Sequence, residues 1–118
     1  HLVTGRPPTT NAASKRWLSH HGIEHEELHH LDKWSRPSWN ETGLQVLRFE
    51  DLHEYQFAFA VEDSLETAIR LVEDYDMQVA LMDRPWNRDL ESVTPATRSR
   101  LVRCDGWGAV STFFDERS

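Results

Sequence analysis

The sequence predicts an α/β protein with a mostly parallel sheet. Two short, continuously apolar runs, at residues 57–61 and 79–82, are typical of strands that are covered on both faces. The segment between them carries apolar residues at helical spacing. Because strands that alternate with helices along a chain form parallel sheets with right-handed crossovers, we expect helices on the faces of one such sheet.

The first half of the chain contains a predicted strand–helix–strand sequence. Residues 1–3 form a short apolar strand that stops at Gly5 and a pair of prolines. A helix then runs to about His20, with Trp17 and Leu18 on its buried face and Gly22 after its end. The candidates for its N-cap are Thr9, Thr10 and Asn11. The remaining elements expected here are a strand, a loop and a short helix, at residues 27–31, 34–42 and 49–55.

The second half repeats the alternation. The strand at residues 57–61 ends at Glu62 and Asp63, and Ser64 is placed to cap the next helix. The apolar face of that helix is predicted to include Leu65, Ala68, Ile69 and Val72. After the strand at residues 79–82, a polar loop leads to a short edge strand at 101–102 and a last helix at 106–114.

Length and charge restrict the classes of protein. With 118 residues the chain is expected to be one domain, and its formal net charge of −7 argues against a nucleic-acid polymer or an anionic membrane as the main partner. Cys104 is the single cysteine, so no internal disulfide can form and a cytoplasmic location is expected. No signal peptide is recognised, and no apolar run approaches the roughly 18 residues that span a bilayer. A small phosphorylated molecule, held by local cations or a metal, remains compatible.

Polar residues follow the four strands predicted at residues 1–3, 27–31, 57–61 and 79–82. In open α/β sheets, ligands bind outside the carboxyl ends of the strands. A hydroxyl, a lysine and an acidic pair at one such edge suit a phosphate group and Mg²⁺, which prefers carboxylate, water and phosphate oxygens. The residues at these ends are Thr4, Gly5, Arg6, Asp32, Lys33, Glu62, Asp63, Asp83 and Arg84.

Three of these segments also carry a resemblance. In order along the chain, they are Leu-Val-Thr-Gly-Arg-Pro at residues 2–7, Val-Glu-Asp-Ser-Leu-Glu at 61–66 and Met-Asp-Arg-Pro-Trp-Asn-Arg at 82–88. With Lys33 between the first two, they resemble the haloacid dehalogenase (HAD) superfamily, in its branch of 5′(3′)-deoxyribonucleotidase-like phosphatases. The resemblance implies a Rossmann-like three-layer core, Mg²⁺, an aspartyl-phosphate intermediate and a small phosphomonoester substrate, in particular a (deoxy)nucleoside monophosphate.

The resemblance also implies residue roles. Thr4 matches the hydroxyl that contacts the transferring phosphoryl group, and Lys33 matches the cation that binds the nucleophile and phosphate, with Arg48 as the alternative. Asp63 matches the metal-binding acid, which Glu62 assists directly or through water. The residues implied at the substrate edge are Gly5, Arg6, Arg84, Asn87 and Arg88.

One part of the family pattern does not occur in this sequence. The family uses an Asp-x-Asp motif at the end of its first strand, which is central in the sheet between the strands that end at Thr4 and Asp63. No Asp-x-Asp lies ahead of Thr4, and Asp74-Tyr75-Asp76 follows a helix, which is the wrong place. We therefore expect a fragment of a phosphatase core that lacks its central strand and, as printed, does not turn over phosphate esters.

Two other functions remain open at this point. One is a catalytically inactive remnant that acts as an interaction module. Its sheet edges would pair with a strand of another chain, and a second copy of this chain would give a homo-oligomer. The other is an unrelated small α/β domain, such as a phosphoacceptor domain that uses Asp63. Glu62 and Asp63 also have a purely structural interpretation, as negative charges that favour a helix N-terminus.

Other residues have simpler interpretations. His21, His25 and His29 recur every four residues, but Gly22 interrupts the helix that would align them for zinc. Cys104 is expected to be a small buried residue. Residues 83–88 can also be interpreted as a rigid loop with an internal ion pair. The tryptophans are expected in the core or as anchors of loops, and base stacking by Trp34 or Trp39 stays open.

Overall fold

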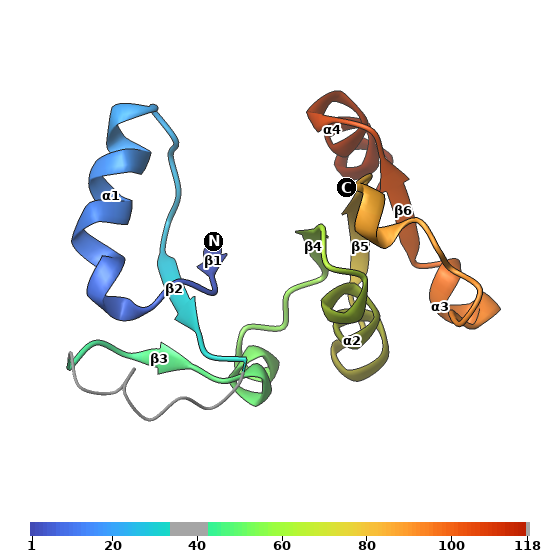
Figure 1. Ribbon diagram of the computed structural model, residues 1–118, viewed down its shortest axis with the longest axis horizontal. Coiled ribbons are helices and arrows are strands. Elements are labelled where there is room, and N and C mark those ends of the chain that lie inside the picture. Colours follow the sequence, from blue (N-terminus) through green and yellow to red (C-terminus); the bar gives the residue numbers. More distant parts are fainter. Residues whose placement is uncertain (34–42, 118) are drawn as a thin grey trace. The chain divides into compact units, whose positions relative to one another are not determined.

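The computed structural model describes residues 1–33 and 43–117, and it shows an α/β protein (Figure 1). The chain comprises two compact units, His1–Tyr55 and Gln56–Ser118, and each is described here by itself. The loop expected at residues 34–42, with Trp34 and Trp39, lies outside the described residues. Within the described parts of the chain, no helix has the length and apolar character needed to cross a membrane.

The first unit contains a three-stranded parallel sheet in the order β1-β2-β3. Its register pairs Leu2 with Leu28 and Thr4 with His30. The strands and helices of this unit are β1 (Leu2–Thr4), η1 (Pro8–Thr10), α1 (Asn11–His20), β2 (Leu28–Leu31), β3 (Val46–Leu47) and η3 (Phe49–Glu54). The strands and helix predicted for this half are confirmed, the short helix is a 3₁₀ helix, and β3 was not predicted because two residues carry too little pattern.

Helix α1 shows where the sequence pattern misled. Gly22 has a positive φ of 64°, which fits the predicted end of the helix. Ser14 and Leu18 are buried, and their spacing of four residues defines the inner stripe of the helix. The prediction that Trp17 is buried is wrong, because Trp17 lies beside this stripe and is 55% exposed, with its ring against His21.

The second unit contains another three-stranded parallel sheet, in the order β4-β5-β6. Its elements are β4 (Phe59–Glu62), α2 (Leu65–Tyr75), β5 (Gln78–Met82), η4 (Pro85–Asn87), α3 (Pro95–Arg98), β6 (Leu101–Cys104) and α4 (Trp107–Arg117). The three strands and two longer helices were predicted. Helix α3 was not, because its four residues lie in a polar segment where only Thr94 and Pro95 mark a helix start.

The core of this unit lies around β5. Ala80 and Met82 pack with Cys104 of β6 and with Val110 and Phe113 of α4. The buried residues of α2 are Thr67, Ala68, Leu71 and Val72, so the predicted stripe is half right: Leu65 and Ile69 are only half-buried. Cys104 is buried, as predicted.

Strand β4 differs from its prediction in burial. Its apolar run was expected to be covered on both faces, but all four of its residues are half-buried. The reason is its position: β5 is central in the sheet, whereas β4 is an edge strand that pairs with β5 alone among the described residues. Phe59 and Val61 pack against the core on one face. Continuous apolar sequence therefore did not mean complete coverage here.

Candidate functional site

The candidate site of the second unit lies at the carboxyl ends of β4 and β5. The parallel register pairs Glu62 with Leu81, so Asp63 and Asp83 both follow directly after their strands at the same sheet edge. Helix α2 begins just beyond, where the Ser64 hydroxyl accepts a hydrogen bond from the backbone N–H of Thr67 at 3.3 Å. The prediction that polar strand ends share an edge is confirmed for this pair.

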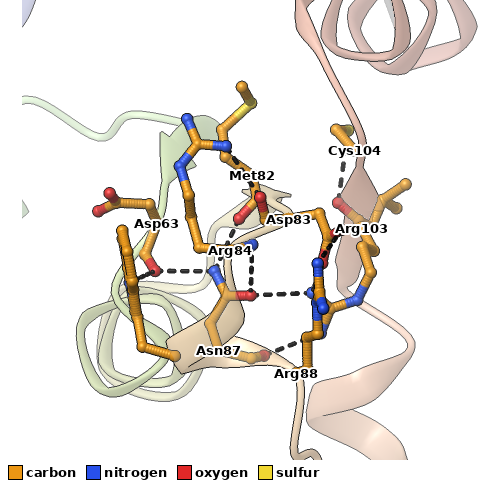
Figure 2. Close-up of polar contacts among 10 residues, drawn as sticks. Asp63, Met82, Asp83, Arg84, Asn87, Arg88, Arg103 and Cys104 are labelled. Carbon is orange, nitrogen blue, oxygen red and sulfur yellow. Dashed lines mark hydrogen bonds and ion pairs between the residues drawn. The ribbon is translucent and has the colours of Figure 1, made fainter.

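Asn87 connects the two strand ends (Figure 2). Its side chain is fully buried, and its amide donates hydrogen bonds to the carbonyl oxygens of Asp63 at 2.8 Å and Met82 at 2.7 Å. Its Oδ1 accepts from the backbone N–H of Arg84 at 3.1 Å and from Arg103 at 2.9 Å. All its polar groups are therefore used inside the protein, so we assign Asn87 a structural role in place of the substrate contact implied by the resemblance.

This Asn87 bridge has a reason in the sheet itself. The backbone N–H of Gln78 donates a hydrogen bond to the carbonyl oxygen of Ala58, just before β4. Since backbone groups alternate in direction along a strand, the N–H and C=O groups of Met82 also point towards β4. At Met82, however, β4 has already ended, and its next N–H, at Ser64, bonds to the Glu62 side chain instead. The Asn87 amide donates to the Met82 carbonyl that the ladder would otherwise leave without a donor.

Asp83 lies between two arginines. Arg88 donates from Nε at 3.2 Å and from a terminal nitrogen at 3.3 Å, and Arg103 donates at 2.9 Å. Hydrogen bonds and charge from Arg88, with a further contribution from Arg103, hold the pKa of Asp83 below its ordinary value despite some desolvation. The expected ion pair within residues 83–88 is thus confirmed. Arg103 was missed, and its only sequence signal is a charge inside an apolar strand.

Asp63 is placed differently from Asp83. Its backbone is held by Asn87 and by the Trp86 indole, which donates to the Asp63 carbonyl at 3.0 Å. One oxygen of Glu62 accepts from the N–H groups of Asp63 and Ser64, at 2.9 and 3.0 Å. The Asp63 carboxylate is exposed and points away from Asn87 in Figure 2. Carboxylate oxygens such as those of Asp63 and Glu62 are the kind of ligand that Mg²⁺ prefers.

The other sequence-predicted residue of this unit is Arg84. Its side chain is half-buried and donates to the carbonyl oxygen of Asp83 at 2.8 Å. This contact fixes the side chain close to the carboxyl ends of the strands. Its role at the substrate edge remains a prediction.

In the first unit, Thr4 is the last residue of β1, and Gly5 and Arg6 follow it in a turn. The Thr4 hydroxyl accepts from the backbone N–H of Arg6 at 3.1 Å, and Gly5 and Arg6 are exposed. His30, buried on β2, holds this turn: its Nδ1 lies 2.9 Å from the carbonyl oxygen of Arg6, and its Nε2 lies 3.1 Å from the Asn11 amide nitrogen. A carbonyl only accepts, so Nδ1 carries the proton and Nε2 accepts from Asn11. Sequence reasoning missed this role of His30.

Lys33 lies two residues after the carboxyl end of β2, the strand whose His30 pairs with Thr4. It is half-buried and comes directly after Asp32, which is 7% exposed and donates its backbone N–H to Leu47 at 2.8 Å. Its alternative, Arg48, lies 3.5 Å from Glu50 and 3.6 Å from Asp51 at the start of η3. Arg48 thus has local ion-pair partners, and both residues stay candidates for the predicted cation.

The structure therefore places the predicted residues in two groups. Thr4, Gly5, Arg6 and Lys33 share one sheet edge of the first unit, and Glu62, Asp63, Arg84 and Asn87 share one edge of the second. The spacing of His21, His25 and His29 makes no metal cluster among the described residues, and the one group that converges combines His29 with other partners. The chain matches no protein-family model, no curated protein sequence and no solved structure in the comparisons made.

Proposed function

We propose that this chain carries the metal- and substrate-binding residues of a HAD-like, Mg²⁺-dependent phosphohydrolase acting on small phosphomonoesters, with (deoxy)nucleoside monophosphates as the favoured class. The observation that carries the proposal is the Asp63 carboxylate. It is exposed at the carboxyl end of β4 and makes no hydrogen bond or ion pair with other described residues, while its backbone is hydrogen-bonded on both sides. Ligands of α/β sheets bind at this edge.

The residues have distinct tasks in this proposal. Asp63 and the second oxygen of Glu62 would hold Mg²⁺, which when bound neutralises phosphoryl charge. Thr4 would donate its hydroxyl proton to a phosphoryl oxygen, and Lys33 would bind the phosphate with its ammonium group. Gly5, Arg6 and Arg84 would line the substrate. The Asn87 bridge and Trp86 act on Asp63 indirectly, because they fix the position of its backbone.

The reaction also requires a nucleophile. The sequence has no Asp-x-Asp ahead of Thr4, so an aspartyl-phosphate and its hydrolysis would need carboxylates from a segment outside this sequence. A Rossmann-like HAD core is part of the proposal. It is supported by the pairing of β1 and of β4 on one side only, within the described residues, because the resemblance implies a further strand beside both.

Mn²⁺ in place of Mg²⁺ tests the metal assignment without any need for turnover. Paramagnetic Mn²⁺ at Asp63 should broaden the NMR signals of the amides nearest to it, those of Asp63 and Ser64. Asp63→Asn should remove the broadening, because it removes the exposed carboxylate. The matched control is Asp83→Asn at the same edge, which should leave the broadening intact, since Asp83 is already paired with arginines. Equal broadening in wild type and Asp63→Asn would exclude Asp63 as a ligand.

A second candidate function, a non-catalytic interaction module, is favoured by the edge of β4, a strand that pairs with β5 alone among the described residues. Gln78 donates to Ala58, so the alternation of the ladder turns the backbone groups of Phe59 and Val61 away from β5. Edge strands that combine apolar side chains with open backbone groups pair with further strands. A second copy of the chain offers the same kind of edge, so this candidate commits to self-association through β4.

Sedimentation velocity distinguishes this candidate. Val61→Pro removes an N–H that faces away from β5, so it should keep the β4–β5 pairing and yet prevent strand addition. If the wild type is a dimer and Val61→Pro is a folded monomer, the interaction module gains support. Trp107→Ser on α4 is the control for general association, because Trp107 is 71% exposed. A wild type that is monomeric at all concentrations tested would exclude self-association through β4.

A further inference from the structure

The amino end of the first sheet brings together three side chains of metal-binding type. They are His1, Glu27 and His29, whose potential ligand atoms all lie within 4.8 Å of one another. The register explains the grouping. Leu2 pairs with Leu28, so His1 lies beside Glu27 on the neighbouring strand, and His29, two residues on, points to the same face. All three belong to the first unit, whereas Glu62 and Asp63 of the proposed Mg²⁺ site belong to the second.

The distances match those of a small coordination sphere. Nδ1 of His1 lies 3.0 Å from Nε2 of His29, and that Nε2 lies 3.2 Å from a carboxylate oxygen of Glu27. Ligand atoms bound at about 2.0–2.1 Å in a tetrahedral zinc site are about 3.3–3.4 Å apart. Metal binding would therefore change these two distances by only a few tenths of an ångström, while the nearly parallel rings of His1 and His29 would have to turn to direct both nitrogens at one ion.

The surroundings of His1 supply a second, independent observation. If Nδ1 of His1 binds a metal, its proton must be on Nε2, and this nitrogen lies 3.5 Å from a carboxylate oxygen of Glu26. A carboxylate behind a ligating histidine is the usual arrangement that orients the ring in metal sites. His29 is held from the other direction, because it is buried and the Tyr55 ring packs edge-on against it at 5.0 Å.

From this geometry we propose that His1, Glu27 and His29 bind a divalent transition-metal ion of the Zn²⁺ type. Two imidazole nitrogens and one carboxylate oxygen suit Zn²⁺ and its neighbours rather than Mg²⁺, which prefers oxygen. Glu27 and His29 also line a cleft of about 430 Å³, so a fourth position is open to water or to a small ligand. The site is independent of the phosphohydrolase proposal, because it shares no residue with it.

Calorimetric titration with Zn²⁺ at neutral pH tests the site. The protein used in the titration has a short extension ahead of His1, so that the ion cannot bind to an α-amino group on this residue. Wild type should bind a single ion. Glu27→Gln keeps the shape of an exposed side chain and should weaken binding by more than about 100-fold, beyond the 10–100-fold typical of residues that only orient ligands. Glu26→Gln should weaken it by about tenfold.

Control variants separate coordination from general effects. His20→Gln removes an exposed histidine at the end of α1 and should leave Zn²⁺ affinity unchanged. Co²⁺ should give the visible absorption of a tetrahedral site in wild type and lose it in Glu27→Gln. His29→Gln should abolish binding, and since His29 is buried, its folding is checked by circular dichroism. Absence of Zn²⁺ binding in wild type, or equal affinity in Glu27→Gln, overturns the proposal.

Discussion

Asn87→Ala should destabilise the unit of residues 56–118 by about 3 kcal/mol. Removal of the side chain leaves the carbonyl of Met82 and the N–H of Arg84 without their hydrogen-bond partners. Each such buried group costs about 1–3 kcal/mol. The Asp63 carbonyl keeps the Trp86 indole as a donor, so it adds little. The two groups together cost about 2–6 kcal/mol. Because Arg84 is half-buried and open to some water, the loss lies in the lower half of that range.

Cys104 provides the assay, since it is the single cysteine of the chain and lies in β6 at 1% exposure. A thiol reagent can reach it only when this unit opens, and burial also raises the pKa of the thiol, which slows reaction in the folded state. A loss of about 3 kcal/mol should raise the labelling rate by about 100-fold. An increase of less than about threefold would refute the reasoning.

Asn87→Asp is the most informative companion variant. It keeps the size and the Oδ1 acceptor, but it replaces the amide donor by an oxygen that faces the carbonyls of Asp63 and Met82. It should therefore destabilise at least as much as Asn87→Ala. Wild-type stability in Asn87→Asp would show that the two donated hydrogen bonds are not the source of the effect. Glu91→Ala, at an exposed position, should change nothing.

Asp83 and His30 give the remaining predictions. The pKa of Asp83 is lowered in the folded state, so its stabilisation is present above the ordinary value of 3.8 and is lost as pH falls through the lower folded pKa. Asp83→Asn should flatten the acid side of the stability–pH curve, measured by urea unfolding, and an unchanged curve would contradict this. His30→Phe should cost about 2–4 kcal/mol, because Arg6 and Asn11 lose a buried partner. Faster amide exchange in β2 would show it, whereas wild-type exchange would rule it out.

Local signals in the sequence predicted local structure well. Ser64 was identified as a helix cap because its hydroxyl acts within its own turn, and Gly22 as a helix end because only its own backbone has to reach a positive φ. The continuous apolar run of β5 also indicated a buried strand correctly. In each of these cases, the physical cause lies within a few residues of the signal.

Long-range arrangement set the limits of prediction. The burial of β4 depends on which strands pair beside it, and the phase error at Trp17 depends on which side of α1 faces the sheet. The family resemblance implied a substrate contact for Asn87. Its actual role depends on where β4 stops relative to β5, which neither strand reveals alone.

The two aspartates at the second sheet edge show how neighbours divide similar residues between different tasks. Both follow apolar strands, and the sequence alone gave both a place among the polar strand ends. Asp83 is neutralised by Arg88 and Arg103, so a cation there would have to displace ion pairs and would meet two positive charges. Asp63 keeps an exposed carboxylate on a backbone that the Asn87 bridge holds in place. Charge balance therefore favours Asp63 over Asp83 as a ligand of the proposed metal ion, independently of the family resemblance.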